Sequence, residues 1–338
     1  MNGNRFKRVL VTGGAGYVGH ALVPRLLAEG HDVVVYDAMY FGGEGLPHHH
    51  AGLKVVEADV RDTASFARAV AGCDAVLHLA CISNDPSFEL DEALSRTINY
   101  DCFEGLVTAA KAARVRRFVY CSSSSVYGVS DAPDVTEDHP LVPLTLYNKF
   151  KGLCEPILFR HQSPEFTCTT IRPATVCGYS PRCRLDLTVN ILTNHAVNKG
   201  KITVFGGDQK RPNLHIDDMV DAYLLMLRAP AEKIAGETFN IGYQNHTVME
   251  IARMVKAIVE REMPGRAPIE IVRTPSNDNR SYHINSDKIF RVLGFRAGRT
   301  IEDAVRDLCR AFRDGLLPDS FDDPRYYNVR TIKRWIAA

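Results

Sequence analysis

Short runs of consecutive apolar residues alternate, through the first half of the chain, with longer stretches whose apolar positions recur every three or four residues. An apolar run bounded by turn residues is typical of a buried strand, and the longer spacing is typical of an amphipathic helix. We expect strands at residues 9–12, 33–36, 53–57, 74–80, 117–121 and 166–171, and helices at 17–29, 63–71, 91–114 and 147–161. This alternation predicts an α/β fold, a doubly wound parallel sheet with helices on both faces.

The pattern becomes less regular after residue 173, where proline, glycine and arginine cluster up to residue 184. We expect a first domain at residues 1–173, to which the chain returns at about 215–245 with a helix (217–227) and a strand (238–242). Residues 174–214 and 246–338 are expected to form a smaller C-terminal α/β lobe that binds substrate, with helices at 248–262, 286–293 and 301–314 and a strand at 269–272. A chain of 338 residues is long enough for both parts.

The first predicted strand passes directly into a turn with three spaced glycines. Gly13 permits a sharp turn, Gly16 lets the backbone approach a ligand, and Gly19 lets the next helix lie close to the strand. A strand, a glycine loop and a helix in this order present backbone N–H groups and a positive dipole end to a pyrophosphate. The loop therefore predicts a Rossmann-type dinucleotide site, whereas an isolated glycine triplet would indicate only a loop.

An acidic residue, Asp37, ends the second predicted strand, about twenty residues beyond the glycine loop. A carboxylate at this place accepts hydrogen bonds from the adenosine ribose and repels a 2′-phosphate. Asp37 therefore predicts NAD rather than NADP as the cofactor.

Composition narrows the classes of partner. A formal net charge of +1 gives no electrostatic case for nucleic acid or an anionic membrane. No stretch reaches transmembrane length and the first residues lack the apolar core of a secretory signal, so we expect a cytoplasmic protein. The nine cysteines form no C-x-x-C pair and are interpreted as reduced thiols. His48-His49-His50 lacks further ligands at useful spacing, so we expect a solvated loop there and no metal site.

Tyr147 and Lys151 lie four residues apart in a predicted helix, and so on one face and one turn from each other. A phenol, with an ordinary pKa of about 10, needs a nearby positive charge to act as a base at neutral pH. Ser123 follows the strand at 117–121 at its carboxyl end, where open α/β sheets bind ligands. A Tyr and a Lys at this spacing are also frequent by chance, and a single serine often only caps its own backbone.

Taken together, the motifs resemble the extended short-chain dehydrogenase/reductase family, and within it the NAD-dependent sugar-nucleotide epimerases and dehydratases of the UDP-glucose 4-epimerase type. The resemblance covers most of the chain. The motifs that carry it are Thr12-Gly13-Gly14-Ala15-Gly16-Tyr17-Val18-Gly19, Asp37, Asp59-Val60-Arg61-Asp62, His78-Leu79-Ala80, Asn99, Ser123 with Tyr127, Tyr147 with Lys151, Arg172-Pro173, Gly206 to Arg211, and His215 to Asp218.

This resemblance implies that Tyr147 is the acid/base, that Ser123 is its partner and that Lys151 holds the nicotinamide ribose. The NAD contacts it implies are Gly13, Gly16, Tyr17, Val18, Gly19, Asp37, Asp59, Val60, Leu79, Ala80, Cys81, Asn99, Ser122, Tyr147, Lys151 and Pro173. The residues expected to bind a nucleotide-diphosphate sugar are Ser123, Ser124, Thr175, Arg184, Asn190, Arg211 and Arg280. The helices at 91–114 and 147–161 correspond to the pair that forms a four-helix dimer interface in relatives, so a homodimer is expected.

Some of these positions have a simpler interpretation. Arg182, Arg184, Asp186, Thr188 and Asn190 are polar enough to line a substrate pocket, but a solvated helix face would explain them equally well. Arg280 could equally form a surface salt bridge. Thr175 stands where the family often has Asn, and Cys81 stands where a second alanine is common, so the identity of the sugar stays open.

The residues after Ser123 bear on the reaction. By the resemblance, sugar 4,6-dehydratases carry Asp-Glu at the positions of Ser124 and Ser125, because dehydration needs a second acid/base pair. We therefore expect 4-epimerisation, by transient oxidation at C4 to a 4-keto sugar and return of the hydride. The alternatives are a 4-keto reductase or dehydrogenase that exchanges cofactor with solution, a dehydratase with acid/base groups from elsewhere, and a non-catalytic NAD-binding scaffold.

Overall fold

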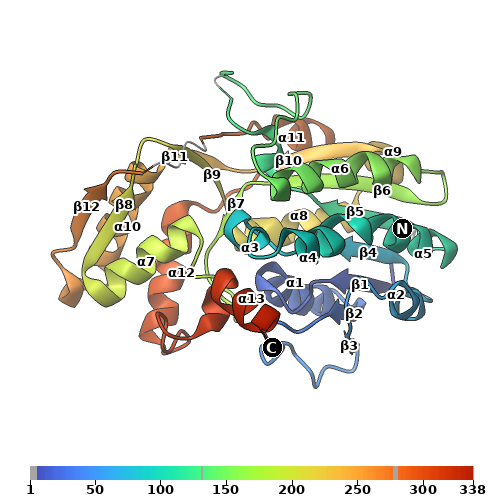
Figure 1. Ribbon diagram of the computed structural model, residues 1–338, viewed down its shortest axis with the longest axis horizontal. Coiled ribbons are helices and arrows are strands. Elements are labelled where there is room, and N and C mark those ends of the chain that lie inside the picture. The colour runs from blue at the N-terminus through green and yellow to red at the C-terminus, as the bar shows by residue number, and fades with distance from the viewer. Residues whose placement is uncertain (1–5, 131, 277–280, 338) are drawn as a thin grey trace.

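A parallel sheet of seven strands forms the centre of the molecule in the computed structural model, which describes residues 6–130, 132–276 and 281–337 (Figure 1). The strands are β1 (Arg8–Thr12), β2 (Asp32–Asp37), β3 (Leu53–Glu57), β4 (Ala75–His78), β5 (Arg117–Cys121), β6 (Thr167–Pro173) and β10 (Glu237–Ile241). Their order in the sheet is β10-β6-β5-β4-β1-β2-β3, and every neighbouring pair is parallel. The strand order reverses between β1 and β4, and such a reversal opens a crevice at the carboxyl ends of the strands. The predicted doubly wound fold is confirmed.

Helices pack on both faces of the sheet. One face carries α1 (Tyr17–Ala28), α8 (Ile216–Arg228) and α11 (Asp287–Leu293), and the other carries α2 (Thr63–Val70), α5 (Phe103–Ala112) and α6 (Leu146–Arg160). Side chains of β1 alternate between the two apolar layers, Val9 and Val11 entering one and Leu10 the other. Consecutive apolar residues therefore mark these strands, because both of their faces are buried.

The helix predicted at 91–114 is interrupted. The structure has α4 (Glu92–Arg96), a π-helical turn at Thr97–Asp101, and then α5. The wide turn places Asn99 inside, where its side chain accepts a hydrogen bond from the Ile82 N–H (2.8 Å) and donates one to the Ile82 carbonyl (2.9 Å). The apolar spacing continues through the turn, so the sequence pattern does not reveal the interruption.

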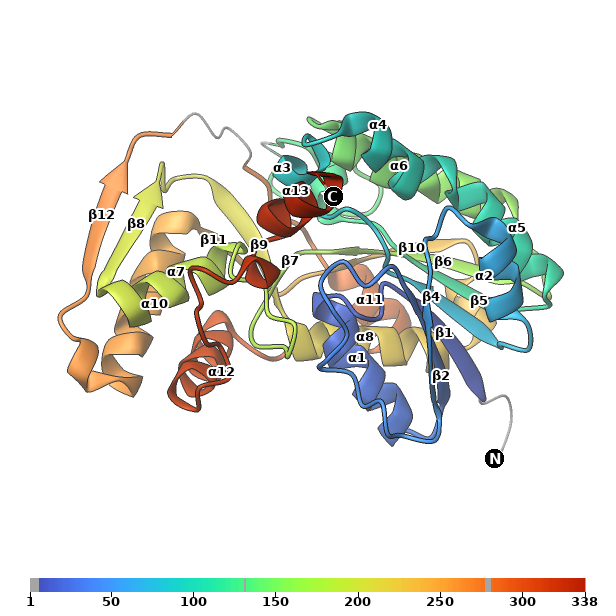
Figure 2. The same cartoon turned by 60° about the horizontal axis from the view of Figure 1, so that its bottom comes forward.

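A smaller lobe lies beside the sheet (Figure 2). It contains a three-stranded sheet, β11-β9-β7, and a two-stranded sheet, β12-β8. Its elements are β7 (Thr175–Cys177), α7 (Thr188–Lys199), β8 (Lys201–Phe205), β9 (Lys210–His215), β11 (Gln244–Thr247), α10 (Val248–Glu262), β12 (Glu270–Thr274) and α12 (Ile301–Arg313). Short helices elsewhere are α3 (Asp85–Phe88), α9 (Ala231–Ile234) and α13 (Asn328–Ala337).

One helix expected in the small lobe packs elsewhere. In α11, Ile289 is buried in the same apolar cluster as Phe239 and Ile241 of β10. The short helix therefore packs against β10, the edge strand of the large sheet, and its apolar face is buried there. The remaining division of the chain into two domains stays a prediction.

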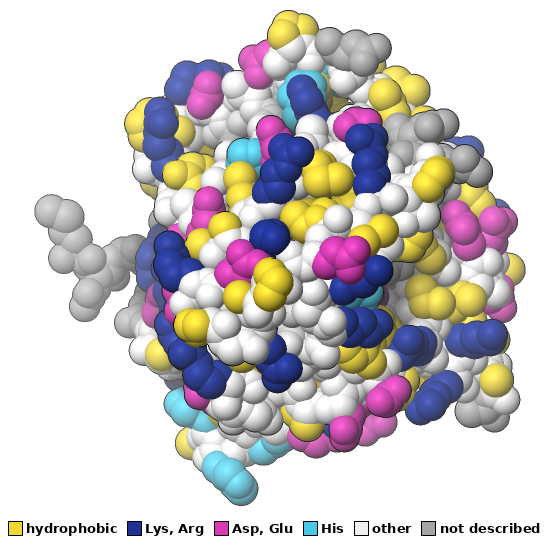
Figure 3. Space-filling model, turned by 90° about the vertical axis from the view of Figure 1, so that its left-hand side faces the viewer, with side chains coloured by type: hydrophobic (Ala, Val, Ile, Leu, Met, Phe, Trp, Pro, Cys, Tyr) yellow, Lys and Arg dark blue, Asp and Glu magenta, His cyan; other side chains and the backbone are white. Residues whose placement is uncertain are grey.

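Charged side chains of both signs are interspersed over the face of the small lobe in Figure 3, in line with the net charge of +1. None of the helices among the described residues combines the length and apolar character that a bilayer crossing requires.

Candidate active site

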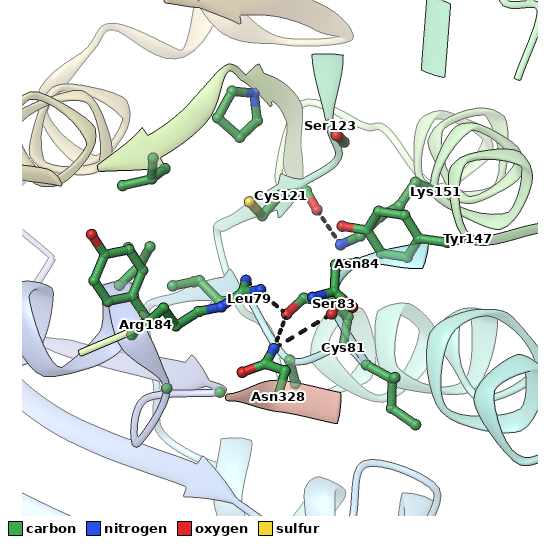
Figure 4. A pocket seen from close by; sticks show the side chains of 18 of the residues that line it. Leu79, Cys81, Ser83, Asn84, Cys121, Ser123, Tyr147, Lys151, Arg184 and Asn328 are labelled. Atoms are coloured by element: carbon green, nitrogen blue, oxygen red, sulfur yellow. Dashed lines mark hydrogen bonds between the residues drawn. The ribbon is translucent and has the colours of Figure 1, made fainter. Parts of the chain in front are cut away.

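A cavity of about 410 Å³ lies at the carboxyl ends of the central strands, at the switch point of the sheet (Figure 4). The residues named from the sequence that line it are Gly13, Gly16, Tyr17, Val18, Gly19, Asp37, Asp59, Val60, Leu79, Ala80, Cys81, Ser122, Ser123, Ser124, Tyr147, Lys151, Pro173, Thr175, Arg184 and Arg211. Residues from the whole length of the chain thus meet at one concave site, as expected for a ligand pocket of an open α/β sheet.

The glycine loop forms the floor of the cavity at the start of α1. Gly13 has a positive φ of 72°, and a Cβ atom there would lie 2.7 Å from the backbone nitrogen of Ala80 after β4. A side chain at Gly19 would meet the backbone oxygen of Gly14. Gly16 is the N-cap of α1 in extended conformation, and no side chain caps this helix end. The result is an open helix N-terminus with room for an anion.

Asp37 lies at the end of β2, facing the glycine loop. Its carboxylate accepts hydrogen bonds from the backbone N–H groups of Ala15 (2.9 Å) and Met39 (2.8 Å). Burial raises the pKa of this carboxyl, and the two N–H groups oppose the rise. The side chain therefore joins the loops after β1 and β2 at the rim of the cavity.

Tyr147 and Lys151 point into the cavity from the first two turns of α6 (Figure 4). Lys151 is buried and donates a hydrogen bond to the carbonyl of Cys121 at the end of β5 (2.7 Å). Burial raises the pKa of Tyr147 above its ordinary value, and the Lys151 ammonium opposes the rise. Burial opposes charge on Lys151, but neighbouring Cys81 and Tyr147 outweigh it, and the pKa of Lys151 is raised. The pair is therefore a phenol beside a permanent ammonium.

Ser123 belongs to a chain of hydroxyl groups that ends on the helix of Tyr147. Its Oγ lies 2.7 Å from Ser125 Oγ and accepts a hydrogen bond from the Ser125 N–H (3.1 Å). Ser125 donates in turn to the side-chain oxygen of Asn148, the neighbour of Tyr147. This arrangement fixes the serine loop relative to α6.

A buried polar network forms the wall behind these groups. Ser122 Oγ donates to Glu155 of α6 (2.6 Å), and Glu155 accepts two hydrogen bonds from the guanidinium of Arg172 on β6 (3.0 and 2.6 Å). Arg172 also donates to Tyr127 (2.7 Å), whose hydroxyl donates to Asn240 of β10 (2.7 Å). This network, termed the rear network below, joins β5, α6, β6 and β10, and so holds the helix that carries Tyr147 and Lys151.

Two sequence-based site residues, Asn99 and Asn190, lie outside the cavity, and a third cannot be placed. Asn99 is outside the cavity and holds Ile82 of the loop after β4. Asn190 is buried and holds the chain that leads to the cavity, accepting from the Gly178 N–H (3.0 Å) and donating to the Arg184 carbonyl (2.8 Å). Arg280 falls outside the described residues.

The structure adds residues that spacing in the sequence did not single out. Asn328, at the start of α13, donates to Ser83 Oγ (2.8 Å) and accepts from Arg182 (2.5 Å), although 146 residues separate it from Arg182. Arg182, Asp186 and Thr188, which the sequence left open between pocket and helix face, do line the cavity. The sequence did not indicate that Glu155 is buried, because a carboxylate inside an amphipathic helix is ordinarily exposed.

An open helix end, a nucleotide-sized crevice and a Tyr-Lys pair define an enzyme of the dinucleotide-dependent class. The family model described as "NAD dependent epimerase/dehydratase family" matches residues 9–242, and the chain belongs to this family. NAD is thus the cofactor, as predicted.

Curated relatives are similar over most of their length. The chain is 30% identical to a UDP-glucose 4-epimerase of Lactobacillus helveticus, over 74% of this chain and 82% of that protein. It is 34% identical to a UDP-glucose 4-epimerase of Mycolicibacterium smegmatis, over 70% and 77%. A crystal structure of dTDP-glucose 4,6-dehydratase from Streptomyces venezuelae with NAD bound is 25% identical, with a TM-score of 0.81 over 94% of this chain and 99% of that one.

Proposed function

We propose that the protein is an NAD-dependent 4-epimerase of a nucleotide-diphosphate sugar. Two relatives at 30% and 34% identity are UDP-glucose 4-epimerases, which supports this class of substrate. Support from the site comes from the Tyr147-Lys151 pair and the Ser123 hydroxyl at one end of the cavity.

The cavity fits the dinucleotide. The glycine loop leaves the α1 N-terminus open for a diphosphate, and Asp37 stands at the rim where an adenosine ribose would lie. Asp59, Val60, Leu79, Ala80 and Cys81 continue this surface toward Lys151, which would hold the nicotinamide ribose. When bound, NAD would accept a hydride from the sugar and return it.

The substrate would occupy the part of the cavity beyond Tyr147. Ser123, Ser124 and Thr175 offer hydroxyl groups there, while Arg184 and Arg211 offer guanidinium groups. Arg211 is the residue we assign to the substrate diphosphate, because a guanidinium matches the oxygens of a phosphate in pairs.

In this mechanism Tyr147 removes the proton from the C4 hydroxyl and later returns it. The ammonium of Lys151 stabilises the phenolate that this transfer requires. Ser123 donates a hydrogen bond to the same sugar oxygen, and the Ser125-Asn148 contact holds the serine in place. Inversion would require that the keto sugar turn over in the site, so that the hydride is returned to the opposite face of C4 and the proton to the C4 oxygen.

The observation that carries the proposal is that carboxylates lining the cavity are already held by hydrogen bonds or ion pairs within the protein. Asp37 accepts two backbone hydrogen bonds, Asp59 is paired with Arg61 (2.6 Å), and Asp186 is paired with Arg184 (2.9 Å). Ser124 and Ser125 stand where a second acid/base pair would be needed for dehydration. Because protein donors already engage these three carboxylates, they favour proton transfer at one sugar position, the one facing Tyr147.

Asp85 favours dehydration as the second candidate function. It lines the cavity, its charge acts on Tyr147, and it accepts a hydrogen bond from Thr145 at the start of α6 (2.6 Å). A carboxylate beside the acid/base tyrosine could abstract a proton from a carbon next to the keto group.

Incubation with UDP-, GDP-, CDP- and dTDP-sugars in deuterated water, followed by NMR, tests both candidates. The 4-epimerase should convert one sugar to its C4 epimer with no deuterium at C3 or C5 and no added cofactor. Deuterium at C5 with loss of the C6 hydroxyl would replace the proposal by the dehydratase. A requirement for stoichiometric reduced cofactor would replace it by the keto-reductase.

We also propose that the protein is a homodimer through α5 and α6. Val142, Leu144 and Leu153 are 57%, 52% and 38% exposed on and before α6, and a second copy of this surface would bury them. Light scattering should show a dimer for the natural chain and a monomer for Leu153→Glu. The matched control Leu316→Glu, at a residue 50% exposed after α12, should stay dimeric. An unchanged mass for Leu153→Glu would contradict this interface.

A further inference from the structure

Arg182 is a buried arginine in the segment that follows β7. Its side chain lines the cavity, and its guanidinium carbon lies 3.7 Å from the centre of the Phe41 ring. One nitrogen donates to Asn328 of α13 (2.5 Å). Its Nε is buried without a hydrogen-bond partner among the described residues.

The charge of this side chain has no direct counter-ion. No carboxylate in the described part of the chain lies within ion-pair distance of Arg182, whereas Arg184, two residues on, is paired with Asp186. Burial, with a contribution from Arg184, lowers the pKa of Arg182 to about 9. A buried cation without an anion is costly, and side chains so placed commonly meet one from a ligand.

The segment around Arg182 is tied to the first turn of α1. Ser180 Oγ donates to the Tyr17 carbonyl (2.8 Å), and the Tyr17 hydroxyl donates to the Gly178 carbonyl (2.6 Å). Phe41, which stacks on the guanidinium, follows β2 and Asp37 on the same side of the cavity. Arg182 is thus positioned near the uncapped N-terminus of α1, where a Rossmann site receives the cofactor diphosphate.

We propose that Arg182 binds the diphosphate of NAD on the side opposite the α1 N-terminus and so helps to retain the cofactor. The helix end supplies neutral N–H groups and a partial charge, and Arg182 supplies the full charge that matches the anion. Asn328 and Phe41 hold the guanidinium in place, so the C-terminal helix takes part in the site. The proposal depends on NAD binding alone and not on the sugar chemistry.

The two arginines of this segment differ in their surroundings. The charge of Tyr147 acts on Arg184, and Arg184 Nη1 donates to Ser83 of the loop after β4 (3.3 Å), so Arg184 reaches toward the catalytic end. Arg182 instead stacks on Phe41, which follows Asp37 after β2, and both Asp186 and Asp37 act on its charge, so Arg182 reaches toward the adenosine end. This difference assigns Arg182 to the cofactor rather than to the substrate.

The test uses Arg182→Met, which keeps the length of the side chain and removes its charge. ADP-ribose carries the diphosphate of the cofactor, and UDP carries that of the proposed substrate. Calorimetry on protein freed of NAD should show ADP-ribose binding weakened roughly 10- to 100-fold, with UDP binding unchanged. Arg182→Lys keeps the charge but loses the planar guanidinium. Its affinity for ADP-ribose should lie between that of the natural protein and that of Arg182→Met.

Arg117→Met is the matched control. Arg117 is also buried with an Nε that has no partner among the described residues, but it donates to the carbonyls of Met226 and Leu227 at the end of α8. It lies at the start of β5, at the end of the strand opposite the cavity. This variant should lower the melting temperature and leave ADP-ribose affinity unchanged. Arg182→Met should leave the melting temperature of the NAD-free protein unchanged or raise it, because an unpaired buried charge is removed.

Unchanged ADP-ribose affinity in Arg182→Met would overturn the proposal, whatever the melting temperature. Weakened UDP binding with unchanged ADP-ribose binding would also overturn it and assign Arg182 to the substrate. Both results are independent of turnover, so loss of the epimerase proposal would leave this one standing. Should Arg182→Met fail to fold, Arg182→Lys carries the same comparison of the two ligands.

Discussion

Two buried arginines, Arg172 and Arg182, lie ten residues apart in the chain and have opposite surroundings. Arg172, in the rear network, makes two hydrogen bonds to Glu155 and one to Tyr127. Burial opposes its charge, but Glu155 outweighs burial and the pKa of Arg172 is raised. Arg182, at the front of the cavity, has one amide oxygen and one aromatic face, and burial lowers its pKa to about 9.

This difference distinguishes side chains that stabilise the fold from side chains that are available to bind a ligand. Donors and acceptors of the rear network satisfy one another, so this wall is complete within the protein and orients α6. The front of the cavity leaves donors on Arg182 and Arg184 without partners among the described residues. Substitutions behind the site should therefore act on folding, and substitutions in front should act on ligands and turnover.

Tyr147→Phe sets the functional extreme of this contrast. It removes one oxygen that faces the cavity, and we expect turnover to fall roughly 10³–10⁴-fold, because Tyr147 is the group that transfers the proton of the C4 hydroxyl in the proposed mechanism. The melting temperature and NAD binding should stay as in the natural protein. Turnover assays with calorimetry check this, and retained turnover would exclude the mechanism.

Glu155→Ala sets the structural extreme. It leaves Arg172 as an unpaired buried charge, and the free energy of unfolding should fall by about 3–5 kcal/mol. Denaturant titration measures the loss. Glu104→Ala, which breaks the exposed Glu104–Arg160 contact (3.4 Å), should change it by less than about 1 kcal/mol. Addition of Arg172→Met to Glu155→Ala should recover stability, and equal losses in single and double variants would contradict the explanation.

Lys151→Met sharpens the contrast through pH. Tyr147 must lose its proton before it can accept one, and its pKa is raised, so oxidation of the sugar should speed up as pH increases into the alkaline range. Loss of Lys151 removes the group that opposes this rise in pKa. The increase in rate with pH should therefore begin about 1–3 pH units higher. Profiles of kcat/KM against pH for both proteins measure the displacement. A shift toward lower pH would be inconsistent with this role.

Trp335→Leu gives the smallest expected effect. The rings of Trp335 in α13 and Tyr40 after β2 lie 4.2 Å apart, and such a contact contributes about 0.5–1.5 kcal/mol. Its loss should speed dissociation of NAD by roughly 2- to 10-fold, less than the effect of Arg182→Met on ADP-ribose. Stopped-flow displacement of bound cofactor measures the rate. If the fold increase in the dissociation rate exceeded the fold loss of ADP-ribose affinity in Arg182→Met, α13 rather than Arg182 would be the main restraint on the cofactor.

Local patterns in the sequence predicted the parallel sheet and the glycine loop, because each strand and turn is encoded by neighbouring residues. The position of Tyr147 beside Lys151 followed from helix geometry in the same way. The interruption before α5 was not predictable, since Asn99 turns inward to bind Ile82, a contact across 17 residues. The contact of Asn328 with Arg182 depends on how two distant segments pack, and no spacing along the chain encodes it.

The packing of α11 shows a further limit. Its amphipathic pattern predicted a helix correctly, but the pattern does not say which sheet the apolar face meets. Glu155 was missed for a related reason, because its partner Arg172 is brought to it by the sheet. Element types are thus local properties of this sequence, whereas burial of charge is a property of the assembled fold.

The missing side chain of Gly13 has a consequence for how ligands enter and leave. Backbone atoms of the loops after β1 and β4 touch at that point, and Thr12 Oγ1 accepts from the N–H groups of Leu79 and Ala80 (both 3.2 Å). This side of the crevice is closely packed, so we expect a dinucleotide to enter and leave past the segment around Arg182 and past α13, which line the other side. Local opening of these two segments should then limit the rate of cofactor exchange. Their amide hydrogens should exchange faster than those of β1 and β4.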